Sequence, residues 1–219
     1  MAVGSFEQFV ADRSAGLLRT AYLLTGDRVA ARDLLQTALI AADRSWDRCA
    51  DAEEAMTVAR RELVAAHTGW QRLLRVGDLL GDSPVLSSAA GFPGFARRPT
   101  DPGPPDEVST ALARLVPKLR ATLVLRYGEG LSVADTAVAL GSPAETVTAD
   151  TVRGLDLLDT DGSRLARQLA ERAQQVTATP EDALASVREG ERDRRSHRLG
   201  LIALAVVLVG IVLVVLVSL

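Results

Sequence analysis

Residues 132–158, SVADTAVALGSPAETVTADTVRGLDLL, contain two short helical patterns separated by a turn. Two serines are each followed three residues later by an acid, which is the spacing of a capping box: Ser132 with Asp135, and Ser142 with Glu145. Pro143 suits the first turn of the second helix, and Gly141 suits the turn between the helices. The stretch therefore predicts a helix-turn-helix, with an ordinary helical hairpin as the alternative.

The apolar residues of this stretch recur at helical spacing on one side of each helix. They predict a shared core of five side chains: Ala137, Leu140, Val147, Val152 and Leu155. The opposite face of residues 143–158 would then remain open, and in a helix-turn-helix this face enters the major groove of DNA. In an ordinary hairpin the same face would bind nothing.

A linker is predicted on the N-terminal side of this motif, followed by the start of the helical domain that contains the motif. Six of the nine prolines fall between Pro84 and Pro105, and a segment of this composition cannot bury enough apolar area to fold alone. Helical periodicity begins again at Glu107. We therefore expect a linker over residues 75–106 and a helical domain over residues 107–160.

The N-terminal residues carry three amphipathic patterns. The first runs from Phe6 to Leu24, a break follows at Thr25, Gly26 and Asp27, and two further apolar stripes run to Trp46 and to Leu74. Three helices of this kind make one bundle. We expect this bundle over residues 1–74.

Whole-chain composition favours an all-α fold made of two small helical domains. Hydrophobic residues make up 47% of the chain and aromatic residues only 4%, while good helix formers dominate. The formal net charge is -3, so a surface for nucleic acid would have to be local. The single cysteine, Cys49, excludes an intramolecular disulfide framework, and we expect a packed thiol in a reducing compartment.

Residues 199–219, LGLIALAVVLVGIVLVVLVSL, are apolar throughout and carry no charge. As a helix they would extend roughly 31 Å, which matches the roughly 30 Å hydrocarbon core of a bilayer. We expect one transmembrane helix from Leu199 to Leu219, because the alternative, a buried core helix, would normally have a polar face. The preceding arginines indicate a cytoplasmic flank, so the predicted location is the cell membrane, single-pass, with the N-terminal domains in the cytoplasm.

A juxtamembrane segment over residues 161–198 joins the second domain to this stretch. It begins with an amphipathic pattern at Leu165, Leu169 and Ala173 and ends in an arginine-rich cluster. The cluster suits a topology signal, and it also suits anionic lipid headgroups.

Two blocks of the chain resemble conserved regions of actinobacterial extracytoplasmic-function sigma factors. The first, with FEQFV, LLRTAYLLTGD, ARDLLQTAL and Trp46, resembles their second region. The second, LARLVPKLRATLVLRYGEGLSVADTAVALGSPAETVTADTVRGLDLL, resembles their fourth region and follows at the expected distance. The order and spacing of the two blocks carry the resemblance, rather than any single motif.

The resemblance implies a transcription-initiation subunit that is not an enzyme and needs no cofactor or metal. Its implied partners are core RNA polymerase and promoter DNA, with an anti-sigma factor as a third candidate, and the apolar segment 199–219 adds the membrane. In the family the DLLQ-containing helix docks on polymerase, which implies contacts by Asp33, Leu34, Leu35 and Gln36. Leu34 and Leu35 could equally be core residues, whereas Asp33 and Gln36 share one helix face.

In the family, basic and aromatic side chains of the third helix hold phosphates and stack on unpaired bases during promoter opening. The matching stretch here is VARRELVAAHTGWQRL, which implies such roles for Arg60, Arg61, Trp70 and Arg72. The stretch has fewer bases than the family pattern, so phosphate binding should be weaker. An alternative role for Trp70 is to cap the bundle core.

The recognition helix departs further from the family pattern. Residues 142–159 carry four acids and one base, a balance of -3, and Asp150 stands where a base is expected. The resemblance implies DNA contacts by Thr146, Thr148 and Arg153. Two functions follow: a membrane-tethered sigma factor that directs promoter-specific transcription, or a sigma-like regulatory protein that has lost promoter recognition.

Overall fold

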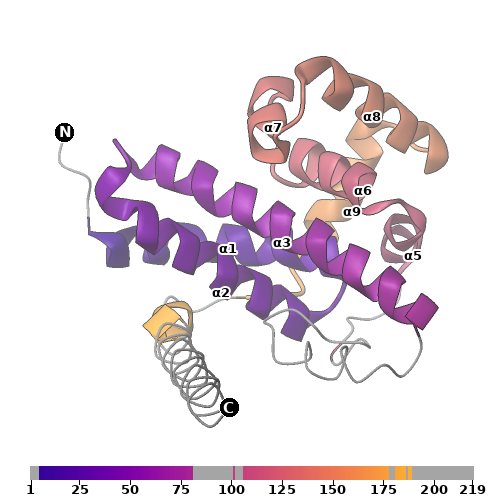
Figure 1. The fold of residues 1–219 in the computed structure, drawn as a ribbon. Helices are drawn as coiled ribbons and strands as arrows, with labels where there is room; N and C mark the ends of the chain where they lie inside the picture. Colours follow the sequence, from indigo (N-terminus) through magenta and orange to yellow (C-terminus); the bar gives the residue numbers. More distant parts are fainter. Residues whose placement is uncertain (1–4, 81–100, 102–105, 178–180, 186, 189–219) are drawn as a thin grey trace, which may run out of the picture.

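The computed structural model describes residues 5–80, 101, 106–177, 181–185 and 187–188, and in the third long helix it describes side chains as far as residue 69. Every element in these ranges is a helix, in agreement with the predicted all-α class. The N-terminal elements are α1 (Phe6–Thr25), α2 (Arg28–Ser45), the short turn η1 (Trp46–Arg48) and α3 (Ala52–Leu80). Figure 1 shows α1, α2 and α3 packed together; we call them the N-terminal bundle.

The junction between α1 and α2 is determined by three consecutive residues. Thr25 ends α1, and Gly26 follows with a φ of 72°, a left-handed conformation that favours glycine. Asp27 then caps α2, because its Oδ1 accepts a hydrogen bond of 2.8 Å from the backbone N–H of Ala30. The predicted break at these residues is confirmed.

The bundle core consists of the predicted apolar stripes and a ring cluster at one end. The rings of Phe6 and Phe9 lie 5.5 and 5.3 Å from that of Trp46, centroid to centroid. Cys49 is buried as a free thiol beside this cluster's helical turn, as predicted. These ring contacts and the buried thiol belong to the hydrophobic core of the bundle.

The remaining helices are α5 (Glu107–Arg114), α6 (Pro117–Leu123), the π-helical turn η2 (Val124–Gly128), α7 (Val133–Leu140), α8 (Ala144–Leu157) and α9 (Gly162–Ala173). We call α5–α8, with η2, the helix-turn-helix domain. Figure 1 shows these helices gathered beside α3. The predicted resumption of helix at Glu107 is confirmed, and Asp106 caps it with its side chain.

α7 and α8 form the predicted helix-turn-helix, but of the two predicted capping boxes only the N-cap half at Ser132 is present. Ser132 Oγ accepts a hydrogen bond of 3.1 Å from the backbone N–H of Asp135, and Gly141 ends α7 with a φ of 57°. The prediction of a second capping box at Ser142 is wrong, because Pro143 is itself the N-cap residue of α8 and no side chain caps that helix. The hydroxyl of Ser142 lies instead near the carbonyl of Leu140.

The predicted shared core of the motif is correct for Val147 and wrong for Val152. Val147 is fully buried, whereas Val152 is 64% exposed. Thr151 and Gly154 take the inward positions, and a Cβ at Gly154 would lie 2.9 Å from Leu123 Cδ1. This close approach to α6 fixes the rotation of α8 and turns Val152 outward.

The N-terminal bundle and the helix-turn-helix domain share one hydrophobic core. Arg120 of α6 lies between them, where its Nη1 donates a 2.9 Å hydrogen bond to the carbonyl of Leu24 and its Nε a 2.8 Å bond to that of Leu112. α3 continues to Leu80, past its predicted end at Leu74, although Gly77 and Asp78 are poor helix formers. Most of the predicted linker, residues 75–106, lies outside the described residues.

In the ranges that the structure describes, no helix combines the length and the hydropathy needed to cross a membrane. The predicted transmembrane helix, Leu199 to Leu219, lies outside those ranges. The amphipathic pattern that precedes it corresponds to α9, which buries Leu165 and Leu169 as predicted.

His67 of α3 is a buried polar residue without a polar partner. It has no exposed surface, and neither ring nitrogen has a hydrogen-bond partner among the described residues. Loss of water disfavours the charged imidazole, and the positive charge of Arg120 acts in the same direction, so the pKa of His67 falls from 6.5 to about 3. The unfolded chain therefore binds the proton more readily, and stability decreases as the pH falls below 6.5.

This burial predicts a pH-dependent stability. The free energy of unfolding should fall by about 1 kcal/mol between about pH 7.5 and about pH 5.5, a window in which ordinary carboxylates stay ionised. His67→Leu should remove most of this change, whereas the matched control His197→Leu, at the other histidine of the chain, should retain it. Urea denaturation followed by circular dichroism at both pH values measures the effect, and an unchanged slope in His67→Leu would contradict it.

Candidate nucleic-acid and polymerase interfaces

The outer face of α8 is free of contacts with other described helices and lines a shallow surface depression. The lining residues are Glu145, Thr148, Ala149, Val152, Arg153 and Asp156. Two of the predicted DNA contacts, Thr148 and Arg153, are exposed on this face, and the third, Thr146, is half-buried. A helix packed on one side and open on the other is the arrangement that lets a helix-turn-helix reach base edges.

The charges on this face are fewer than the sequence of α8 suggests. Asp150 turns toward α6, where its Oδ2 lies 3.4 Å from Nζ of Lys118. That partner compensates part of its charge, so the outer face carries two acids, Glu145 and Asp156, beside the base Arg153. A phosphate backbone would still meet a small excess of negative charge.

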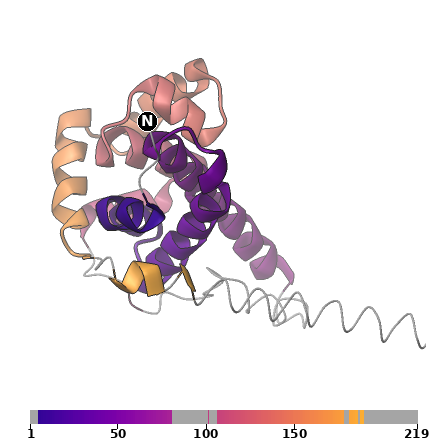
Figure 2. The ribbon, with the colours of Figure 1, turned by 90° about the vertical axis from the view of Figure 1, so that its left-hand side faces the viewer.

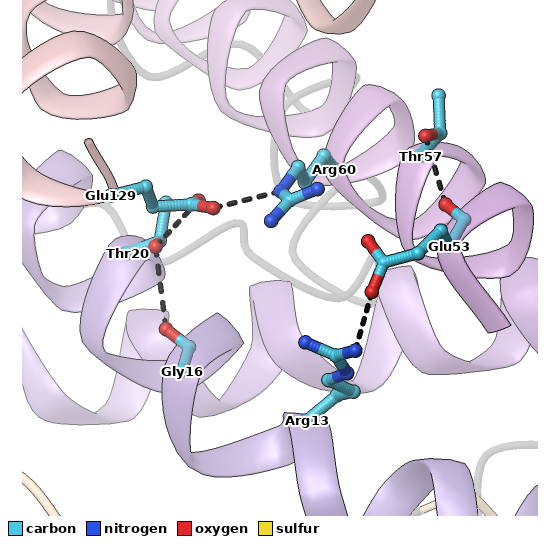
Figure 3. Close-up of polar contacts among 7 residues, drawn as sticks. All are labelled: Arg13, Gly16, Thr20, Glu53, Thr57, Arg60 and Glu129. Atoms are coloured by element: carbon cyan, nitrogen blue, oxygen red, sulfur yellow. Dashed lines mark hydrogen bonds and ion pairs between the residues drawn. The ribbon is translucent and has the colours of Figure 1, made fainter. Parts of the chain in front are cut away.

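Arg60 of α3 lies at the boundary between the N-terminal bundle and the helix-turn-helix domain. Its Nε donates a 2.7 Å hydrogen bond to Oε2 of Glu129, and Thr20 Oγ1 donates one of 2.7 Å to the other carboxylate oxygen (Figure 3). The side chains of Arg60 and Glu129 are only 17% and 12% exposed. Such a shielded, charge-assisted pair is stronger than a pair in water. The predicted DNA-binding group of Arg60 is therefore held by an internal carboxylate.

A second arginine pair on the same side of the molecule has a different environment. Arg13 of α1 pairs with Glu53 of α3 (Figure 3), but their side chains are 41% and 64% exposed. Ion pairs in water contribute little to stability. Arg13 and Glu53 both belong to the N-terminal bundle. Of the two pairs in Figure 3, only the one between Arg60 and Glu129 therefore connects the bundle to the helix-turn-helix domain.

The other predicted promoter-opening residues occupy separate positions. Arg61 is exposed and, with Lys118 of α6, lines a groove between α3 and the helix-turn-helix domain. The apolar side chains of this groove include Val64, Val116 and Leu140. Trp70 and Arg72 belong to the helical backbone of α3, and their side chains lie outside the described part of the chain. Their roles stay predictions.

The predicted polymerase-docking residues of α2 divide into two pairs. Leu34 and Leu35 are 2% and 5% exposed and belong to the bundle core, which favours the structural alternative for both. Asp33 and Gln36 are half-buried at the surface, and each already interacts within the chain. Of the four predicted docking residues, Asp33 and Gln36 are thus the two with appreciable exposed surface, and their contact with polymerase stays a prediction.

Sequence reasoning missed the residues that join the two helical groups. Glu129 pairs with residues that are 69 and 109 positions away in the sequence. Its local signal is an acid between two glycines, which indicates a turn and no partner. Among the described residues, no cluster of three or more histidine, cysteine or acidic side chains could hold a metal ion. The candidate sites are open surfaces that suit macromolecules.

Comparison with known proteins agrees with this geometry. Residues 106–158, which include α5 to α8, match the family description "Sigma-70, region 4". The chain is 34% identical over 178 residues to the RNA polymerase sigma-E factor of Streptomyces avermitilis, a match that covers 76% of this chain and 94% of that protein. It is 33% identical over 193 residues to the RNA polymerase sigma-E factor of Streptomyces coelicolor, covering 86% of this chain and 95% of that protein. The chain therefore belongs to the sigma-70 family, in its extracytoplasmic-function type.

Proposed function

We propose that this protein is a membrane-tethered sigma factor that binds core RNA polymerase and directs promoter-specific transcription initiation. The observation that carries the proposal is the open outer face of α8, which lies within the segment that matches sigma-70 region 4. Relatives that align over most of their length are named RNA polymerase sigma-E factors. The protein would act by positioning polymerase on DNA, without covalent chemistry of its own.

Promoter recognition would place α8 in the major groove. Thr148 and Arg153 would then face base edges and phosphates, since both are exposed on the outer face. The acids Glu145 and Asp156 weaken attraction to any phosphate backbone, so binding of the chain alone should be weak and strongly dependent on salt. Useful affinity would come from the polymerase complex, in which several contacts act together.

Promoter opening would require the helix-turn-helix domain to separate from the N-terminal bundle. In the described conformation Arg60 binds Glu129, and one guanidinium cannot hold this carboxylate and a phosphate equally well. Core polymerase, which would bind through Asp33 and Gln36 on α2, would stabilise the separated arrangement. An anti-sigma factor, our other proposed partner, would favour the closed one.

The membrane tether is the apolar segment 199–219, which is long enough to span a bilayer once. The arginine-rich cluster before it would keep the rest of the chain on the cytoplasmic side and near anionic lipids. Tethering would restrict the sigma factor to DNA near the membrane until the anchor is removed.

The function is tested by transcription with the full chain in mild detergent and core polymerase. Promoter-specific transcripts should appear, and Arg153→Ala should lower their yield about ten-fold at limiting protein, the effect of one lost base contact. Arg114→Ala, an exposed base on α5, is the matched control and should transcribe normally. Polymerase binding without transcripts from any promoter would indicate a regulator, and no polymerase binding would refute the proposal.

The ion pair between Arg60 and Glu129 predicts that Glu129→Gln increases DNA binding. The substitution removes the carboxylate charge that holds Arg60, so the affinity of the polymerase complex for promoter DNA should rise about three- to ten-fold. The matched control is Glu62→Gln, which removes one exposed negative charge from α3. Filter binding at several salt concentrations measures both. An equal rise in both variants would mean that net charge, and not release of Arg60, causes the effect.

The tether predicts a change of cell fraction. Deleting residues 199–219 should move the protein from membranes to the soluble fraction, and Val207→Arg with Leu208→Arg should do the same, because each central arginine costs about 3 kcal/mol of insertion free energy. Ser218→Ala is the control and should stay with membranes. Fractionation and immunoblotting give the result, and retention of the deleted chain on membranes would contradict a tether at this segment.

A further inference from the structure

α9 lies beyond the segment that matches sigma-70 region 4, which ends at residue 158. It is a separate amphipathic helix, and its start is fixed by Asp161, whose Oδ1 accepts a 2.9 Å hydrogen bond from the backbone N–H of Arg164. Its inward face buries Leu165, Leu169 and Arg172 almost completely. We call residues 162–176 the C-terminal clasp.

The clasp contacts both parts of the molecule. Figure 2 shows α9, in orange, running from the helix-turn-helix domain past the side of α1, and α9 contacts α1, α5 and η2. α1, α9 and η2 meet at Gly128, where a Cβ would lie 2.9 Å from Leu23 Cδ1 and 3.7 Å from Leu169 Cδ1. A leucine of α1 and a leucine of α9 thus enclose the end of η2, the residue before Glu129.

Arg172 makes the polar connection of the clasp, with a side chain only 3% exposed. Its Nη1 donates a 2.6 Å hydrogen bond to Oδ2 of Asp106, and its guanidinium lies 4.9 Å from the ring centroid of Tyr22. Burial by itself would raise the pKa of Asp106, but hydrogen bonds from Ser109 and Arg172 outweigh it and the pKa is lowered. Arg172 therefore links Asp106, at the start of α5, to Tyr22 of α1.

Tyr22 extends this connection along the clasp. Its hydroxyl donates a 3.0 Å hydrogen bond to Oε1 of Gln175, and Val176 beyond it is buried in the same core. The clasp thus contacts α1 through an apolar pair, a cation–π contact and a hydrogen bond. Each of these would have to break for the helix-turn-helix domain to move away from α1 together with α9.

We propose that the C-terminal clasp is an autoinhibitory segment: it holds the helix-turn-helix domain on the N-terminal bundle and so keeps Arg60 on Glu129. It lies after the DNA-reading helix in the chain and before the apolar segment 199–219. Displacement or removal of the clasp would therefore release Arg60 from Glu129 and let the helix-turn-helix domain, whose α8 face is already open, move away from the N-terminal bundle. The inhibitory role rests on the proposed sigma function, whereas the closing role does not.

The test measures the distance between the two parts in the full chain in detergent. Spin labels at Asp47→Cys on η1 and Ala134→Cys on α7, in a Cys49→Ala background, report it without any polymerase. Leu169→Ala with Arg172→Ala should lengthen and broaden this distance, and should raise affinity for core polymerase about five-fold or more. The matched control Arg167→Ala removes an equal charge from the exposed face of α9 and should change neither quantity.

Two further measurements keep the test decisive. Circular dichroism should give the parent helicity for the double variant, which excludes general unfolding. A specific protease site inserted between Thr160 and Asp161 allows the clasp to be severed after folding, and cleavage should lengthen the distance in the same way. An unchanged distance after both treatments would overturn the proposal that the clasp holds the two parts together. A longer distance without any gain in polymerase affinity would overturn its inhibitory role, and no polymerase binding by any form would instead refute the sigma function.

Discussion

The guanidinium of Arg120 is the contact on which the joined arrangement of this protein depends. The residue is 8% exposed, and its guanidinium donates hydrogen bonds to the carbonyls of Leu24, Leu112 and Ala113. These carbonyls lie at the C-terminal ends of α1 and α5, where helix dipoles favour a positive charge. A buried charge needs such partners, because an unpaired one costs several kcal/mol. Separation of the helical groups would break the bond to Leu24 of α1, while the bonds to Leu112 and Ala113 lie within the helix-turn-helix domain.

The boundary between the N-terminal bundle and the helix-turn-helix domain also explains why the predicted DNA-contacting groups are not all free to bind DNA at once. Arg60 is held by Glu129, and Lys118 is paired with Asp150, whereas Arg153 remains open to solvent. Charges that could meet phosphate are thus partly used inside the molecule. When a reading helix carries few bases, its attraction to DNA of any sequence is weak. A larger share of the free energy of binding then comes from correct base contacts and from polymerase.

Much of the fold could be predicted because its signals are local. The end of α1 at Thr25, the turn at Gly26 and the cap at Asp27 follow from backbone preferences of adjacent residues. Cys49 was predicted as a packed thiol and is one. The prediction of a cap at Ser142 was wrong, because the proline after it takes the N-cap position and no single-residue preference decides between them.

The sequence by itself determined the helical class, the junction between α1 and α2, the start of α5, the turn between α7 and α8, and which residues resemble a sigma factor. These properties depend on neighbours within about four residues, so periodicity and capping reveal them. Only the tertiary structure decided that Val152 faces outward, that Leu34 and Leu35 are core, and that Arg60 pairs with Glu129. The physical reason is that the rotation of a helix about its axis, and the partner of a charge, are set by surfaces distant in the sequence. For α8 the packing of Gly154 against Leu123 establishes the rotation, and Arg60 meets Glu129 only because the turn after η2 lies beside α3 in the folded chain.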